Sequence, residues 1–408
     1  MIKPLERQSL LNGVRILDFG RVAAAPSGTY LLALLGAEVI RVESSTALDS
    51  YRKGDADAKS SSLFTSINAG KKSVAVNLKT EAGRQVALRM VREADVITEN
   101  FSPGTMIRLG LGYEVVREQN PQIIMISAST SGQQGPGSRS AGYAPIFAAL
   151  GGLADITGYN DSGPALFGRA VDARVGVFVA LAALVGLFWR QREGVGCYLD
   201  LSAQEVIASL IGDVLTEVSA TGIDSERVGN ETLGHAGEGC YVCAGGAEWV
   251  FLELEDDRDW QSLVTLIGKD NKILSVLATA DSAERWDRRR DVESVVEGWM
   301  VRRTATDALR SLQAAGLSAG IVRDAPQLFA DLHLRSRNFW RSVDFSRGTN
   351  GPASTIAIGL PAIWLEGSTP KTPVGAAPLL GADTETVLLG VGLSIGDIER
   401  LRQEGVLD

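Results

Sequence analysis

Histidine is nearly absent from this chain of 408 residues, which contains only His235 and His333. The two lie far apart in the sequence, and neither stands in a recognisable partner motif. A metal site built from several histidines is therefore excluded, and a Ser-His-Asp relay would have to use one of these two. We expect no histidine-based chemistry.

Cysteine is also scarce, because the chain has only Cys197, Cys240 and Cys243. Three cysteines give no disulfide framework. Cys240 and Cys243 have the spacing of a metal or redox pair, yet their segment has the pattern of a strand running into a turn, and no second pair exists. We predict no metal site. Because the first residues lack the apolar stretch of a signal peptide, we also predict a cytoplasmic protein.

Long apolar runs and an excess of positive charge are missing as well. The longest apolar run without a charged side chain, residues 175–189, is shorter than the ~20 residues needed to span a bilayer. The formal net charge is -9, whereas nucleic-acid binding requires a basic face. We therefore predict neither a membrane nor a nucleic-acid partner. A small anionic ligand, which needs only a few local cations, stays open.

What the chain does contain is a regular alternation of strand and helix patterns, with 45% hydrophobic and 22% charged residues. Buried-strand patterns occur at residues 14–19, 38–43, 73–78, 95–98, 123–127 and 194–201. Helical patterns lie between several of these strands. The alternation predicts an α/β fold with an open, doubly wound parallel sheet. Ligands bind such a sheet at the carboxyl ends of its strands, here in the loops after residues 19, 43, 98 and 127.

A change in composition near residue 225 divides the chain. We predict a large domain over residues 1–224 and a smaller domain over residues 225–325. Residues 326–408 are then a return linker and the last part of the large domain. Within the smaller domain, residues 240–254 have the pattern of a hairpin.

One carboxylate, Asp172, stands just before residues 175–189, which we predict to form a buried helix rich in small residues. A carboxylate at a helix start lies near unpaired backbone N–H groups and the positive end of the helix dipole. It is then held ionised in one orientation and could act as a nucleophile. The alternative is that Asp172 is an ordinary helix N-cap, and local sequence leaves both interpretations open.

A series of motifs runs in order along nearly the whole chain and resembles class III coenzyme A transferases. This family includes formyl-CoA, carnitine and bile-acid CoA-transferases. Each motif is weak alone, and their shared order is what makes the resemblance specific. The matching segments are residues 11–18, 35–43, 68–73, 94–104, 108–110, 120–121, 135–136, 142–143, 172–176, 194–196 and 380–388.

The resemblance implies a Rossmann-like large domain built from both ends of the chain, with a smaller α+β domain inserted. It also implies an interlocked, ring-like homodimer, or a hetero-oligomer with a related subunit. The implied activity is CoA transfer between an acyl-CoA donor and a carboxylate acceptor. Asp172 matches the catalytic aspartate, which forms a mixed anhydride and then an aspartyl-CoA thioester. No cofactor is bound permanently, because coenzyme A is part of the substrate.

The resemblance also suggests which residues contact coenzyme A, whose three phosphates need local cations. The matching positions are Val22, Ala23, Arg41, Lys71, Lys72, Asn100, Phe101, Arg108 and Tyr143. The nearest match to the family's mobile glycine loop contains Gly237, Glu238 and Gly239. Backbone donors of that loop could stabilise an oxyanion and shield the intermediates from water.

Two departures from the family pattern bear on the substrate. Members that act on formyl-CoA often have Gln-Ala-Gly-Pro where this chain has Ala23-Ala24-Ala25-Pro26, and a cation where it has Ser44. These differences argue against formyl-CoA and oxalate and suggest a more apolar acyl pocket. Residues 142–152 resemble members that act on larger or aromatic acids.

Three alternatives remain. An alpha-methylacyl-CoA racemase of the same fold needs a second base, a histidine, where this chain has Tyr143. A nicotinamide dehydrogenase needs Gly-x-Gly-x-x-Gly after the first strand, and the chain lacks it there. A silent CoA-binding subunit is disfavoured by the presence of Asp172. No motif encodes the donor or the acceptor acid.

Overall fold

The structure is a computed structural model that describes residues 9–52, 61–268, 271–337, 339–344, 355–359 and 375–407. The chain forms two compact units. Unit 1 comprises Met1–Ala154, Leu166–Ile223 and Asn338–Asp408, and unit 2 comprises Asp155–Ala165 and Asp224–Arg337. The predicted small domain lies within unit 2, which also contains residues 155–165 and 326–337.

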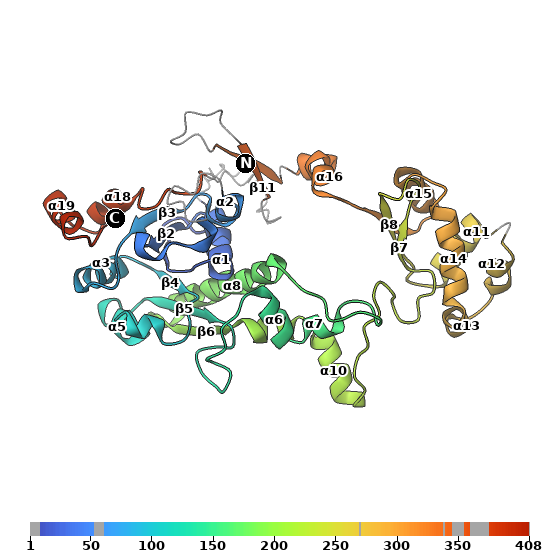
Figure 1. Ribbon diagram of the computed structural model, residues 1–408, viewed down its shortest axis with the longest axis horizontal. Helices are drawn as coiled ribbons and strands as arrows, with labels where there is room; N and C mark the ends of the chain where they lie inside the picture. The colour runs from blue at the N-terminus through green and yellow to red at the C-terminus, as the bar shows by residue number, and fades with distance from the viewer. Residues whose placement is uncertain are drawn as a thin grey trace, which may run out of the picture. The chain divides into compact units, whose positions relative to one another are not determined.

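Six parallel strands form the sheet of unit 1, in the order β3-β2-β1-β4-β5-β6 (Figure 1). The strands are β1 Arg15–Asp18, β2 Glu38–Glu43, β3 Lys72–Ala75, β4 Val96–Glu99, β5 Ile124–Ser129 and β6 Tyr198–Ser202. The strand order reverses between β1 and β4, which is the switch point of a doubly wound sheet. The predicted α/β fold with a parallel sheet is therefore confirmed.

Helices connect these strands and complete unit 1. They are α1 Ala24–Leu34, α2 Ser62–Asn68, α3 Glu81–Val91, α4 Thr105–Arg108, α5 Tyr113–Gln119, α6 Ala144–Leu150, α8 Arg169–Glu193, α9 Ala203–Ser209, α10 Gly212–Thr221, α18 Thr384–Gly390 and α19 Ile395–Gln403. Two short 3-10 helices, Ser45–Ala47 and Ser50–Arg52, follow β2. The helix α7, Leu153–Ile156, lies where the chain passes from unit 1 to unit 2. An antiparallel pair, β10 Trp340–Asp344 and β11 Thr355–Gly359, precedes the last two helices.

Both faces of the sheet are covered, because neighbouring residues in each strand point to opposite sides. Ile16 and Val96 pack in the cluster that includes α1 and α8. Their neighbours Leu17 and Ile97 pack in the cluster that includes α3, α18 and α19. The nearly continuous apolar character of the predicted strands follows from this double burial.

The C-terminal segment closes the edge of the sheet at β3. The N–H groups of Ser73 and Ala75 donate to the side chains of Asp383 and Thr384, at 2.9 and 3.1 Å. Unit 1 is thus completed by residues from both ends of the chain, and the exposed edge strand gains partners.

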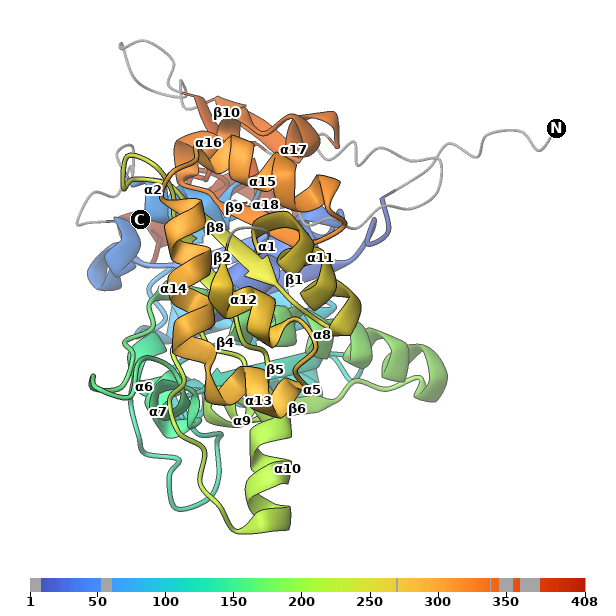
Figure 2. The same cartoon turned by 90° about the vertical axis from the view of Figure 1, so that its right-hand side faces the viewer.

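Unit 2 contains a three-stranded antiparallel sheet, β7 Gly239–Val242, β8 Trp249–Glu253 and β9 Ser318–Val322, which confirms the predicted hairpin. Its helices are α11 Asp257–Ile267, α12 Lys272–Leu277, α13 Ser282–Asp287, α14 Arg289–Met300, α15 Ala305–Ala314, α16 Ala325–Ala330 and α17 Leu332–Ser336 (Figure 2). Val250 and Leu252 point into a core shared with these helices, while Trp249 and Phe251 on the other face are exposed.

Close packing of α1 against α8 fixes the start of α8. A Cβ atom on Gly28 would lie 2.5 Å from the carbonyl oxygen of Gly176, and one on Gly176 would lie 2.7 Å from the Cβ of Ser27. Only glycine lets the two backbones approach this closely.

Among the described residues, α8 is the one helix long and apolar enough to cross a membrane by length and composition. The expectation of no such segment rested on the uncharged run alone, whereas the helix extends beyond it at both ends. Its buried face, which includes Val179 and Ala183, packs in the core, as in the central helix of a globular domain.

We predict that Gly28→Ala destabilises the protein by about 1–3 kcal/mol, because the added methyl group overpacks the α1–α8 contact. Gly212→Ala in α10 is the matched control, since nothing lies within 4 Å of a Cβ at that position. Chemical denaturation measures both variants. If the two variants have equal free energies of unfolding, the close approach of α1 and α8 at Gly28 is not needed for stability.

Candidate active site

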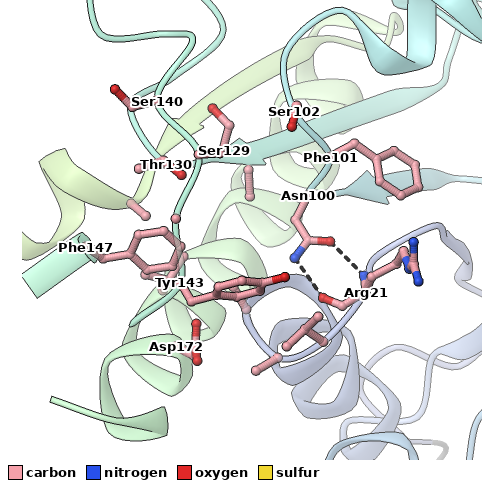
Figure 3. A pocket seen from close by; sticks show the side chains of 18 of the residues that line it. Arg21, Asn100, Phe101, Ser102, Ser129, Thr130, Ser140, Tyr143, Phe147 and Asp172 are labelled. Carbon is pink, nitrogen blue, oxygen red and sulfur yellow. Dashed lines mark hydrogen bonds between the residues drawn. The ribbon is translucent and has the colours of Figure 1, made fainter. Parts of the chain in front are cut away.

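A pocket of about 360 Å³ lies at the carboxyl end of the sheet, at the switch point between β1 and β4 (Figure 3). Val22 and Ala23 follow β1, Asn100 and Phe101 follow β4, and Ser129 ends β5. The next loop, after β2, contributes Ser50. All four strand ends chosen from the sequence thus reach one cavity, which is where doubly wound sheets bind ligands.

Asp172 lines this pocket from the first turn of α8, and only 6% of it is exposed. The N-cap of α8 is Gly168, so the N-cap interpretation of Asp172 is wrong. The helix begins at Arg169, six residues before the apolar run of residues 175–189 from which it was predicted. Its first turns include the charged residues Arg169 and Arg174. The carboxylate therefore faces the pocket from within the helix, near the positive end of its dipole.

Burial raises the pKa of Asp172 to about 6. Among the described residues, none donates a hydrogen bond to its carboxylate or pairs with it as a cation. Desolvation without a partner makes a carboxylate more basic than in water while leaving it ionised at neutral pH. These are the properties of an available nucleophile rather than of a structural ion pair.

Hydroxyl groups are frequent in the pocket wall. Those of Ser50, Ser102, Ser129, Thr130, Ser140 and Tyr143 stand among its lining residues. Large apolar side chains there include Phe101, Phe147 and Val175. The pocket wall is therefore mixed, with hydroxyl groups from the end of β5 and the residues after it beside apolar side chains. The prediction of a pocket more apolar than that of the formyl-CoA enzymes stays a prediction.

Lys71 lies in a buried ionic cluster behind the pocket rather than in its lining. Its Nζ donates to Asp18 Oδ2, Asn68 Oδ1, Thr29 Oγ1 and the Pro26 carbonyl oxygen, all within 2.8–3.0 Å. Burial lowers the pKa of Lys71 to about 8 although the charge of Asp18 opposes this. Burial also acts to raise the pKa of Asp18, but its cationic neighbours outweigh it and the net shift is downward.

Arg41 belongs to the same cluster and is 1% exposed. Its guanidinium donates to Asn68 Oδ1 at 2.9 Å and to Asp49 Oδ2 at 3.0 Å, and it lies 3.5 Å from Asp18 Oδ2. These placements do not favour the predicted contact of Arg41 or Lys71 with CoA phosphates, because both cations are already desolvated and paired.

The other predicted cations are accessible. Lys72 pairs with Glu38 at 2.5 Å with 39% of its side chain exposed. Arg108 is exposed at the end of α4, and its guanidinium donates to Thr105 Oγ1 and to the carbonyl oxygen of Pro103, a pocket residue. Tyr143 lines the pocket and is 66% exposed.

The predicted glycine loop lies in unit 2. Gly237 and Gly239 have positive φ angles of 87° and 151°, which favour glycine. Glu238 between them is buried, and its carboxylate accepts from the Leu254 N–H at 3.1 Å and from the Thr232 hydroxyl. The loop is therefore anchored to the end of β8.

Several pocket residues were not predicted, including Arg21, Ser129, Thr130 and Phe147. For Arg21, Ser129 and Thr130 the position at or after a strand end was the available signal, whereas Phe147 lies within α6. Alternation alone does not tell which side chain points into the pocket. Among the described residues, no group of three or more His, Cys, Asp and Glu side chains could hold a metal ion.

With this geometry in place, comparison with known proteins identifies the family. Residues 11–384 match CoA-transferase family III, and the chain therefore belongs to this family. A succinyl-CoA–D-citramalate CoA-transferase from Chloroflexus aurantiacus is 33% identical over 80% of this chain and 82% of its own length. A CAIB/BAIF family protein from Brucella suis has a similar structure, with a TM-score of 0.83, 26% identity, and coverage of 94% of this chain and all of that one.

A probable CoA-transferase from Mycobacterium tuberculosis is 29% identical over 97% of this chain, which spans 50% of the length of that relative. The family and these named relatives do not favour the racemase alternative.

We predict that Asp172→Asn stabilises the free protein at neutral and alkaline pH. A carboxyl group whose folded pKa is about 6 and whose ordinary value is 3.8 binds protons more tightly when folded. Its ionisation therefore lowers stability as pH rises from 3.8 to 6, and the penalty persists above 6. The difference should reach about 1–3 kcal/mol near pH 8 and vanish below about pH 4.

Thermal or denaturant unfolding of the two proteins across this pH range measures the effect. Destabilisation by Asp172→Asn at pH 8 would mean that the carboxylate has a stabilising partner and would contradict this description.

Proposed function

We propose that the protein transfers coenzyme A from an acyl-CoA donor to a carboxylate acceptor, with Asp172 as the covalent nucleophile. The observation that carries this proposal is a buried carboxylate, without a partner in the described part of the chain, on the wall of a pocket at the sheet switch point in a member of CoA-transferase family III. A carboxylate without a cation partner keeps its electron pair available for attack.

In the first step, an Asp172 oxygen attacks the thioester carbonyl of the donor and the C–S bond breaks. A mixed anhydride and CoA thiolate result. The thiolate then attacks the Asp172 carbonyl, which releases the donor acid and leaves an aspartyl-CoA thioester. The acceptor carboxylate then attacks the aspartyl-CoA thioester, which gives a second mixed anhydride and releases CoA thiolate. The thiolate attacks the acceptor carbonyl of this anhydride, so the acceptor leaves as its CoA thioester and the Asp172 carboxylate is restored. No oxidant, reductant or water is consumed.

Exclusion of water protects both intermediates, because an anhydride and a thioester hydrolyse when solvent reaches them. On the resemblance alone, the glycine loop of residues 237–239 is the candidate for this role. For the CoA phosphates we favour Arg108, which is accessible and donates to the carbonyl oxygen of the pocket residue Pro103, over the buried Arg41 and Lys71. Lys72 is accessible too, but its side chain pairs with Glu38 at the amino end of β2, away from the carboxyl ends where the pocket lies.

The acid that is exchanged should be short and carry a polar group. Ser129 and Thr130 are each 7% exposed, and within the described part of the chain no partner is found for the buried Ser129 hydroxyl. A site with buried hydroxyls discriminates against acids that cannot hydrogen-bond to them. Succinyl-CoA is the donor to test first, because the relative from Chloroflexus aurantiacus is named for it.

We propose that Asp172→Ala lowers the rate of CoA transfer by about 10³-fold or more, because no other carboxylate lines the described pocket. Asp213→Ala is the matched control, since Asp213 also lies in the first turn of a helix but is exposed outside the pocket. Transfer from succinyl-CoA to short hydroxy acids, their deoxy analogues and aromatic acids is followed by chromatography of the CoA esters. Substantial transfer by Asp172→Ala would overturn the proposal.

A cytoplasmic homodimer is the assembly we propose, with a hetero-oligomer of related subunits as the alternative. The outer face of α8 exposes Val177, Leu181, Val185, Phe188 and Trp189, each by about half. No residue of α10 is buried, and both views show this helix projecting from unit 1 (Figures 1 and 2). A second copy would cover such an apolar face.

Sedimentation equilibrium should therefore give twice the mass of the chain, and Leu181→Asp with Phe188→Asp should shift the protein toward the monomer. A wild-type monomer at micromolar concentration would rule out the homodimer.

A further inference from the structure

The backbone between β1 and α1 adopts a conformation that its sequence does not favour. Val22 has a φ angle of 62°, and it is the one non-glycine residue with positive φ among the described residues. A β-branched side chain is strained in this left-handed region, and such strain persists only where the surrounding structure imposes it. Val22 lines the pocket together with Asp172, so the strained position belongs to the site.

Three successive N–H groups of this loop each donate to a side chain from a different part of the sheet. Gly20 donates to Asp18 Oδ1 at 2.8 Å, and Val22 donates to Asp49 Oδ2 at 2.9 Å. Between them, Arg21 donates to Asn100 Oδ1 at 2.7 Å. The loop is thus fixed from β1, from the segment after β2 and from the segment after β4.

Asn100 makes the most complete of these contacts. Its Nδ2 also donates to the Arg21 carbonyl oxygen at 2.9 Å, so the amide bonds both backbone groups of Arg21, as Figure 3 shows. The two bonds hold the peptide planes on either side of Arg21, and the second of these planes is the one that precedes Val22. The bonds also join the two loops that meet across the switch point between β1 and β4.

We propose that Asn100 is a positioning residue, whose amide holds the Arg21 backbone so that Val22 stays in its left-handed conformation beside Asp172. The proposal differs from the CoA contact expected for Asn100, because the side chain acts through the loop. Its kinetic part rests on the proposed transferase function. Its structural part does not, since the coupling between Asn100 and Val22 is a property of the folded chain.

The test is a double-mutant cycle of Asn100→Ala with Val22→Gly. Glycine adopts positive φ without strain, so a loop with Gly at position 22 needs the Asn100 bonds less. In the wild-type background, Asn100→Ala should slow acylation of Asp172 by succinyl-CoA about 100-fold with less than a threefold change in KM. In the Val22→Gly background the same substitution should cost less than about tenfold.

The control is Ser102→Ala, which removes another polar pocket side chain on the same loop and should show no coupling to Val22→Gly. A loss expressed mainly in KM, or equal losses in both backgrounds, would show that Asn100 binds CoA directly and would overturn the positioning role.

Denaturant unfolding of the four proteins of the cycle (wild type, Asn100→Ala, Val22→Gly and the double variant) provides a measurement that needs no turnover. Asn100→Ala should destabilise the wild type more than it destabilises the Val22→Gly variant. Additive effects on stability would contradict the proposal even if the enzyme transfers CoA. If the two substitutions are coupled in their effects on stability but the protein does not transfer CoA, the positioning role of Asn100 is supported and the proposed function is rejected.

Discussion

A buried ionic cluster is the feature on which the sheet and the pocket both depend. It contains three acidic and three basic side chains, Asp18, Glu43, Asp49, Arg41, Arg52 and Lys71, none more than 6% exposed. The cluster joins the ends of β1 and β2 to the segment after α2, and Arg52 reaches the Pro378 carbonyl oxygen near the C-terminus. Because removal of one partner leaves an unpaired buried charge, at a cost of about 3–5 kcal/mol, the six side chains form one structural unit.

This cluster reaches the pocket through two carboxylates. Asp18 and Asp49 each use an oxygen to fix a backbone N–H of the loop after β1, while their charges are balanced by Lys71 and Arg41. These cations are thus paired within the scaffold, and among the described residues none pairs with Asp172 in the pocket. The pocket therefore combines a loop held rigidly by the ionic cluster with a carboxylate that is available for attack, and covalent transfer requires both. The close contact of α1 with α8 holds the two walls together.

The sheet could be predicted from the sequence because its signal is local. The predicted strand at residues 123–127 falls largely within β5, since a continuous apolar run between helical patterns indicates a strand buried on both faces. The roles of individual polar residues could not be predicted in this way. Arg41 and Lys71 follow the same pattern as solvent-facing cations, and only the tertiary structure shows that Asp18 and Asp49 pair with them. The start of α8 was not predicted, because Arg169 and Arg174 interrupt the apolar pattern on either side of Asp172. Both arginines are exposed, so the first turns of the helix accommodate them.

The central claim is that Asp172 forms a covalent bond to CoA during turnover. Intact-protein and peptide mass spectrometry after mixing with acyl-CoA donors, without an acceptor, tests it most directly. We predict a mass gain equal to CoA less one water on the peptide that contains Asp172, absent from Asp172→Ala and removed by an acceptor acid that yields its CoA ester. Transfer that proceeds at full rate with no modified Asp172 peptide at any time point would contradict the account.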